Sequence, residues 1–293
     1  MHTALLLDMV ADAAPDRLAL GRRADGLTFA ETRARARRGA GWLAGQGGAT
    51  VTFVGLNGPA LPVAIFAAGL LGKPFAPLNY RLPDADLNRL LARTSPSVAI
   101  VDDDMAHRLK PVDGVTVVTR SAFEAAAADP ANADVEPPRA DPDIAVLLFT
   151  SGTTGEPKAA ILRHANLTSY VISTVEFLGS EEDEAALVSV PPYHIAGISA
   201  VLTGVYGGRR IVHLQAFTPE TWVEAAACEA ITHAMVVPTM LGRILDVLEK
   251  TGEVLPAMKA LSYGGGRMPL PVIERALNLL PHVDFVNAYG LTE

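Results

Sequence analysis

The sequence predicts an α/β fold built on doubly wound, mainly parallel sheets, and three observations lead to this prediction. Hydrophobic residues make up 49% of the 293 residues, which supplies enough apolar material for a sizeable core. From residue 50 onward, short continuous apolar runs alternate with helical patterns. Continuous apolar runs are typical of strands buried on both faces, and such strands occur in parallel sheets.

In the first half of the chain, turn signals separate the expected elements. Asn57-Gly58-Pro59 ends an apolar run and puts a proline near the start of the next helix. The Ala-, Asp- and Pro-rich stretch Ala125–Pro142 is predicted to be a connector. The expected strands are Thr50–Leu56, Phe75–Pro77 and Ser97–Val101, and the expected helices are Thr3–Ala13, Phe29–Gly45, Ala60–Leu71 and Asp84–Ala92.

The second half resumes the alternation after the strongly apolar strand Ile144–Phe149. Thr218 precedes Pro219 at one helix start, which is the pattern of a capped N-terminus. The further strands are Ala186–Val190, Arg210–Leu214, Thr232–Val237, Lys259–Ser262 and Val283–Asn287, and the helices are Asn166–Phe177, Gly197–Val205, Pro219–Glu229, Thr239–Glu249 and Leu270–Leu279. We expect two successive α/β layers, residues 50–180 and 185–293, with residues 1–48 docked on the second.

Composition and charge argue against several classes of protein. The net charge of −8 disfavours a general nucleic-acid binder, because neutralising phosphates needs clustered Lys and Arg. The single cysteine, Cys228, excludes a disulfide framework, and its Ala-rich neighbours predict a buried thiol. Met1–Val10 lacks the basic region of a signal peptide, and Val63–Leu71 is too short to span a bilayer. We therefore expect a cytoplasmic protein.

The sharpest motif is the nine-residue segment Thr150–Lys158, TSGTTGEPK, which directly follows an apolar strand. Its two glycines let backbone amides approach an anion, and its hydroxyls and ammonium add donors, so it predicts a triphosphate-binding loop. The other interpretation is a solvated turn. The segment is not a Walker A motif, because no Ser or Thr follows its lysine, and it does not match G-x-G-x-x-G.

This segment resembles the phosphate loop of the adenylate-forming superfamily, which includes acyl-CoA synthetases, luciferases and peptide-synthetase adenylation domains. One departure is Ala159, where members usually carry Gly. Three further segments resemble family signatures in the same order: Pro191–Gly197 (PPYHIAG), Tyr263–Pro269 (YGGGRMP) and Asn287–Glu293 (NAYGLTE). Leu78–Leu82 and Val237–Met240 are weaker family-like pieces.

The resemblance implies a role for individual residues. Thr150, Ser151, Gly152, Thr153, Thr154, Gly155 and Lys158 would hold the phosphates; Gly264, Gly265, Gly266, Tyr289 and Gly290 would meet the adenine; Thr292 would contact the α-phosphate; Glu293 and Thr153 would hold Mg²⁺. The implied catalytic residues are Thr153, Lys158, His194, Thr292 and Glu293. His194 would line the acyl pocket and the thiol entrance without needing to titrate.

The resemblance also implies a reaction and a missing part. A carboxylic acid, fatty or aromatic, would be activated with Mg·ATP to an acyl-adenylate and then transferred to coenzyme A. The chain would be the N-terminal portion of the adenylation domain, two α/β/α subdomains without the later β-barrel part and the mobile C-terminal domain. Val286–Glu293 reads as a strand running into a turn, which also predicts a fragment. We expect this fragment alone to bind nucleotide weakly and to turn over little.

Two other functions stay open: a phosphate-loop ATPase of another type, and a non-catalytic nucleotide- or acyl-binding remnant.

Three charged clusters are expected to be structural rather than functional. Asp102–Asp104 is predicted to be a solvated turn rather than a metal site, and Glu181–Glu184 an exposed loop. The arginines of one predicted helix are expected to form a solvated face: Arg33, Arg35, Arg37 and Arg38. The oligomeric state is left open.

Overall fold

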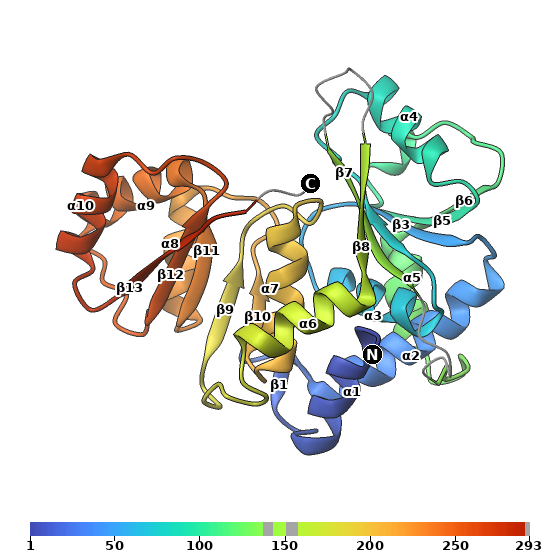
Figure 1. The fold of residues 1–293 in the computed structure, drawn as a ribbon, viewed down its shortest axis with the longest axis horizontal. Helices are drawn as coiled ribbons and strands as arrows, with labels where there is room; N and C mark the ends of the chain where they lie inside the picture. Colours follow the sequence, from blue (N-terminus) through green and yellow to red (C-terminus); the bar gives the residue numbers. More distant parts are fainter. Residues whose placement is uncertain (137–142, 151–157, 291–293) are drawn as a thin grey trace.

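The fold is taken from a computed structural model, which describes residues 1–136, 143–150 and 158–290. These residues form two sheets, each at the centre of a lobe (Figure 1). The six-stranded sheet contains β3 (Thr50–Val54), β4 (Phe75–Pro77), β5 (Ser97–Val101), β6 (Val115–Thr119), β7 (Ile144–Thr150) and β8 (Lys158–Arg163). Its order is β6-β5-β3-β4-β7-β8, and the strands are parallel except for β8, which runs antiparallel to β7.

The seven-stranded sheet contains β1 (Leu18–Leu20), β2 (Leu27–Thr28), β9 (Ala185–Val188), β10 (Arg210–His213), β11 (His233–Val236), β12 (Ala260–Gly264) and β13 (Asp284–Ala288). Its order is β13-β12-β11-β9-β10-β1-β2, and all pairs are parallel except β1 with β2. The prediction of an α/β fold with mainly parallel sheets is therefore confirmed.

The helices pack on and between these sheets. They are α1 (Ala4–Ala13), α2 (Phe29–Gly45), α3 (Ala60–Leu70), α4 (Asp84–Arg93), α5 (Arg120–Ala128), α6 (His164–Thr174), α7 (Ile195–Tyr206), α8 (Pro219–Cys228), α9 (Pro238–Thr251) and α10 (Leu270–Leu279), with a short 3₁₀ helix at Ala106–Arg108. Helices α8, α9 and α10 lie together at one side of the seven-stranded sheet (Figure 1). No helix among the described residues is both long and apolar enough to cross a membrane.

Most predicted elements are present within three residues of their expected bounds, and five strands and helices were missed. Thr218 caps α8 as predicted, accepting a hydrogen bond from the backbone N–H of Thr221. Besides the short 3₁₀ helix, the missed elements are β1, β2, β6, α5 and β8. The edge strand β6 is half-exposed, and α5 occupies the first residues of the predicted connector. The strand β8 alternates exposed and half-buried residues, so it lacks the continuous apolar run that marks the parallel strands.

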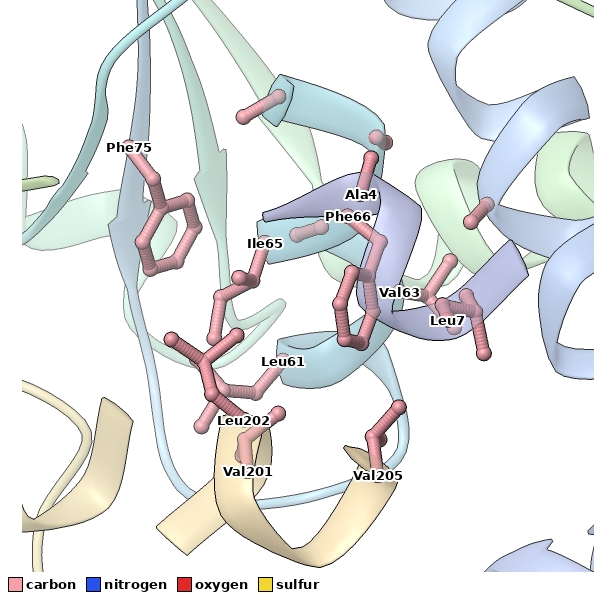
Figure 2. Close-up of a cluster of buried hydrophobic side chains, with 14 of the residues drawn as sticks. Ala4, Leu7, Leu61, Val63, Ile65, Phe66, Phe75, Val201, Leu202 and Val205 are labelled. Atoms are coloured by element: carbon pink, nitrogen blue, oxygen red, sulfur yellow. The ribbon is translucent and has the colours of Figure 1, made fainter. Parts of the chain in front are cut away.

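The main core joins the two lobes. All eleven residues of α3 are buried, and its side chains form one cluster with those of α1 and α7 (Figure 2). Phe66 of α3, Leu7 of α1 and Val205 of α7 belong to this cluster. Because α7 follows β9 of one sheet and α3 follows β3 of the other, this core fixes the position of the sheets relative to each other.

The N-terminal segment contacts both lobes. Its strand β1 pairs with β10, with Leu20 opposite Ile211, and so extends the seven-stranded sheet. Its helix α2 packs instead against α3 and α5 beside the six-stranded sheet. We propose that residues 50–180 and 185–293 are the two subdomains, with residues 1–48 docked through β1 on the second and through α2 on the first.

Two predictions about structural side chains are wrong. Cys228 is exposed rather than buried, because the buried stripe of α8 consists of Trp222, Val223 and Ala226. Asp102 does not lie in a solvated turn: it is buried and accepts a hydrogen bond from the backbone N–H of Leu56 at 2.8 Å. It also pairs with Arg120 at 3.1 Å. Asp102 therefore ties together the loops that follow β3 and β5.

The predicted solvated face of α2 is instead tied to its neighbours by ion pairs. Arg33 pairs with Asp12 of α1, and Arg37 pairs with Asp8 of α1 at 3.1 Å. Arg37 also reaches Glu136 at 2.8 Å, and Arg38 reaches Asp134 at 3.8 Å. These arginines are partly buried, so they attach α2 to α1 and to the segment after α5 instead of facing solvent alone.

Candidate functional site

The carboxyl ends of the parallel strands from both sheets meet at one junction between the lobes. In sheets of this kind, ligands bind outside the carboxyl ends of the strands. The predicted motifs lie at such ends: Thr150 ends β7, and His194, Gly264 and Tyr289 lie at or just beyond the ends of β9, β12 and β13. The fold therefore brings motifs from distant parts of the sequence to the same junction.

Two contacts fix this junction. Asn57, which follows β3, is buried, and its Nδ2 donates to the backbone oxygens of Val190 at 2.9 Å and Leu214 at 3.4 Å. The ring of Tyr80, beyond β4, packs edge-on against the ring of Tyr193, beyond β9, with centroids 5.5 Å apart. The segment around Tyr80 was singled out in the sequence, whereas Asn57 was interpreted only as part of a turn.

The predicted phosphate loop connects the antiparallel strands β7 and β8. Thr150 and Lys158 lie opposite each other in the last residue pair before the loop, and Lys158 is exposed. Ser151, Gly152, Thr153, Thr154 and Gly155 lie outside the described residues. A strand follows the loop, rather than a helix, which agrees with the conclusion that the motif is not a Walker A loop.

His194 occupies the N-cap position of α7, next to Tyr193, with ring centroids 4.7 Å apart. Desolvation by its neighbours and the positive charge of Arg81 lower the pKa of His194, so the ring is neutral at pH 7. The glycine of this motif has a structural reason, because a Cβ on Gly197 would lie 2.9 Å from the backbone oxygen of Pro191. This motif therefore presents a neutral imidazole at a tight turn into α7.

The predicted adenine-binding segments lie side by side at the end of the sheet. Gly264 pairs with Ala288 across β12 and β13, so Gly265 and Tyr289 follow on adjacent strands. The side chain of Tyr289 is 91% exposed, which is unusual for an aromatic residue and leaves its ring free to stack on a flat ligand. Thr292 and Glu293 lie outside the described residues.

The three consecutive glycines have different roles in the fold. A Cβ on Gly264 would lie 2.3 Å from the oxygen of Ala288, and Gly265 has a φ of +76°, so local structure requires both. A Cβ on Gly266 would have no heavy atom within 4 Å. The fold therefore leaves Gly266 as the glycine that local packing does not explain, as expected if a ligand comes close to its backbone.

We expect Gly264→Ala to lower stability and Gly266→Ala to weaken nucleotide binding. Gly264→Ala forces β12 and β13 apart and should lower the free energy of unfolding by about 1–3 kcal/mol. Gly266→Ala should leave it within about 0.5 kcal/mol and weaken nucleotide binding several-fold. Urea denaturation and titration with a nucleotide measure the two effects. Normal nucleotide affinity in Gly266→Ala would remove this residue from the candidate site.

A groove of about 220 Å³ runs between α7 and the face of the seven-stranded sheet that α8–α10 leave uncovered. Helix α7 contributes Ala196, Ser199, Ala200, Thr203 and Gly204, which recur at helical spacing on one face. Two neighbouring strands supply the opposite wall. Val236 is buried beneath α8–α10, and Met235 and Ser262 line the groove. Side chains alternate between faces along a strand, so Met235 and Val236 lie on opposite faces of the sheet.

A charged cluster lies at the far end of this groove, at the amino ends of the strands. Glu184, predicted to lie in an exposed loop, is buried, and its carboxylate pairs with Arg209 at 2.9 Å and Lys259 at 2.8 Å. Although desolvation opposes ionisation, the hydrogen bonds from Lys259 and Arg209 hold the pKa of Glu184 below its ordinary value. Desolvation, together with the charge of Arg209, lowers the pKa of His233 to about 4.

His213, at the end of β10, lines a separate cavity of about 650 Å³ between the β1–β2 turn, α3 and α5. Neither ring nitrogen has a hydrogen-bond partner among the described residues. Burial, and the charge of Arg120, lower the pKa of His213 from 6.5 to about 3. In the unfolded chain the imidazole of His213 binds a proton near pH 6.5, whereas in the folded chain it stays neutral at that pH. The free energy of unfolding therefore falls as the pH drops from 6.5 towards 3.

We expect His213→Leu to reduce this pH dependence. Between pH 8 and pH 5 the native protein should lose about 2 kcal/mol of stability through this histidine, a loss that the variant avoids. Denaturant unfolding of both proteins at the two pH values measures the difference. If the two stabilities change in parallel with pH, His213 is not held neutral in the folded protein.

The described residues contain no group of three or more His, Cys, Asp or Glu side chains arranged to hold a metal ion. The two residues predicted to bind Mg²⁺, Thr153 and Glu293, lie outside the described residues. The metal assignment therefore stays a prediction.

Comparison with known proteins identifies the family to which this arrangement belongs. Residues 7–293 match the family of AMP-binding enzymes, and the chain is a member of it. It is 33% identical over 288 residues to a feruloyl-CoA synthase of Amycolatopsis sp., an alignment that covers 97% of this chain and 58% of that protein. The resemblance to adenylate-forming enzymes inferred from the four motifs is confirmed.

Solved structures agree with this assignment. The o-succinylbenzoate coenzyme A synthetase of Bacillus subtilis in complex with AMP is 26% identical, with a TM-score of 0.82 over 98% of this chain and 74% of that one. The N-terminal domain of FACL13 from Mycobacterium tuberculosis shares the fold, with a TM-score of 0.86, at 22% identity over 100% of this chain and 76% of that one. The chain thus spans little more than half the length of the curated relative.

Proposed function

We propose that this chain forms the nucleotide- and acid-binding part of an AMP-forming acid–thiol ligase. The observation that carries the proposal is the junction between the lobes. His194, the Gly264–Gly266 turn and the exposed ring of Tyr289 lie at or beyond the carboxyl ends of parallel strands, and Lys158 begins β8 opposite the last residue of β7. Membership of the AMP-binding family and similarity to a feruloyl-CoA synthase support it. ATP would lie across this junction, with its adenine against Tyr289 and its phosphates towards Lys158.

The proposed reaction has two steps. A carboxylate oxygen attacks the α-phosphorus of ATP, the bond to the β-phosphate oxygen breaks, and an acyl-adenylate and pyrophosphate form. A thiol, which we propose to be that of coenzyme A, then attacks the acyl carbon and releases AMP. The protein contributes positioning and charge neutralisation rather than covalent catalysis. Lys158 would bind the departing pyrophosphate, and Thr292 would hold the α-phosphate.

His194 would border the acyl carbon without exchanging protons. Its lowered pKa keeps the imidazole neutral, so it adds no charge beside the attacking carboxylate.

Mg²⁺, when bound, would neutralise part of the phosphate charge, and Glu293 and Thr153 would hold it. Because ATP and coenzyme A are its proposed substrates, we propose that the enzyme acts in the cytoplasm.

The groove between α7 and the sheet would hold the acyl group. Its near end is lined by Ala196, two residues after His194, and its middle is lined by small or apolar residues, including Ala200, Val188 and Met235. Such a lining fits a flat or extended apolar group better than an amino acid. We propose an aromatic acid in preference to a fatty acid, because the curated relative named above is a feruloyl-CoA synthase.

The test of the proposed function is carboxylate-dependent exchange of labelled pyrophosphate into ATP. We propose that the complete enzyme carries a further C-terminal domain, because the chain spans 58% of the length of that relative. Exchange should therefore be slow with this chain and faster with one extended through such a domain. Equal rates would contradict the proposed need for the domain, and exchange by neither chain with any acid would contradict the proposed function.

A further inference from the structure

The groove between α7 and the sheet ends in polar groups, which is unusual for a pocket that holds an apolar tail. Its lining on α7 runs from Ala196 to Gly204, a length of about 12 Å at the helical rise per residue. The strands run antiparallel to α7, so Gly204 lies at the amino ends of the strands with Arg209 and His233. The end farthest from the nucleotide motifs is therefore lined by a guanidinium and an imidazole.

The hydrogen bonds around His233 determine which ring nitrogen carries the proton. The hydroxyl of Thr232 accepts from the backbone N–H of Ala185 and donates to the oxygen of the same residue, both at 3.0 Å. The Nδ1 atom of His233 lies 2.8 Å from this hydroxyl oxygen, so Nδ1 donates to it. The carboxylate of Glu184, 3.9 Å from Nδ1, also favours a proton there. The Nε2 atom is left as an acceptor.

Arg209 supplies the complementary donor. Its Nε and Nη2 atoms donate to Glu184, at 3.2 and 2.9 Å, which fixes the plane of the guanidinium and leaves Nη1 as a further donor. A hydroxyl group can accept from Arg209 and donate to Nε2 at the same time. An apolar end group would desolvate both side chains without replacing their hydrogen bonds to water.

Charge disfavours an anionic end group. Glu184 already pairs with Arg209 and Lys259, and it directly follows Glu181, Glu182 and Asp183 in the sequence. A third cation, Arg17, donates to the backbone oxygens of Ser180 and Glu181. A second carboxylate at this place would approach an acidic segment whose nearby cations are already paired. The far end of the groove is thus suited to a neutral group that both donates and accepts.

We propose that the acid activated by this enzyme carries a hydroxyl group at the end remote from its carboxylate, bound between Nε2 of His233 and the guanidinium of Arg209. This inference rests on the proposed function, since it assumes that the acyl group lies in this groove. It assigns His233 and Arg209 as specificity-determining residues of the acid site.

The test uses two matched pairs of acids, cinnamate with para-hydroxycinnamate and decanoate with ω-hydroxydecanoate, together with para-carboxycinnamate. Calorimetric titration of the 293-residue chain should give at least one pair in which the hydroxylated acid binds about tenfold more tightly. His233→Phe keeps a ring of similar size and should reduce this preference to about one. His282→Phe, the same change outside the groove, should keep it, and circular dichroism checks that both variants fold.

The outcomes separate the two proposals. If no acid binds, the groove is not an acid site, and the proposed function fails together with this inference. If acids bind but hydroxylation has no effect, or His233→Phe keeps the preference, the proposed function stands and the inference is wrong. Tighter binding of para-carboxycinnamate than of para-hydroxycinnamate would also overturn the inference.

Discussion

Phe66→Ala is expected to lower the free energy of unfolding by about 3–5 kcal/mol, the largest stability effect of a single substitution that we predict. Phe66 is fully buried in α3, whose side chains form one core cluster with those of α1 and α7 (Figure 2). Removing the ring leaves a cavity between elements that belong to different lobes. The surrounding helices are held by the two sheets, so they can close this cavity only in part.

Denaturant unfolding followed by circular dichroism measures this effect. Leu270→Ala is the control, because Leu270 of α10 is 66% exposed and its truncation should change stability by less than about 0.5 kcal/mol. A loss below about 1 kcal/mol for Phe66→Ala would mean that α3 does not join the lobes. A variant that fails to fold would agree with the expected loss, and Phe66→Leu, with a smaller cavity, then measures a partial effect.

Lys158→Met is expected to reduce carboxylate-dependent pyrophosphate exchange by about 100-fold, the largest effect on activity. The ammonium lies at the end of the predicted phosphate loop, where it would oppose the charge on the departing pyrophosphate. Lys158 is exposed at the edge of the six-stranded sheet, so the substitution should leave stability within about 0.5 kcal/mol. A slower exchange rate with unchanged stability would therefore be an effect on the reaction and not on folding.

Lys250→Met is the matched control for this substitution. Lys250 lies in the last turn of α9, is exposed and is separate from every predicted motif. The Lys250→Met variant should exchange pyrophosphate at the rate of the native protein. If Lys158→Met also exchanges at the native rate, the Thr150–Lys158 segment does not bind the phosphates through its lysine, and the central part of the site assignment fails.

Much of the fold could be predicted from the sequence, because its strands are short apolar runs separated by Gly and Pro turns. The helix α2 and the strands β4 and β5 have the expected bounds. The strand β8 was missed because its pattern is that of an antiparallel edge strand and not of a buried parallel one. The charged clusters were misassigned because the partners of Asp102 and Glu184 lie 18 or more residues away in the sequence.

The candidate site was predictable where one local motif supplies it. His194, Gly264 and Tyr289 were predicted this way, and the fold places each at or beyond the carboxyl end of a strand. The groove was less predictable, because alternation along a strand shows that neighbours face opposite sides but not which side faces the ligand. Met235 lines the groove, whereas its neighbour Val236 is buried in the core on the other face.

We propose that the complete enzyme joins a carboxylic acid to the adenylyl group of ATP. The most direct measurement identifies the products formed from ATP with and without a carboxylic acid. We expect AMP and pyrophosphate, formed only when an acid is present. Release of ADP and phosphate at the same rate without any acid would contradict it and would favour an ATPase of another type.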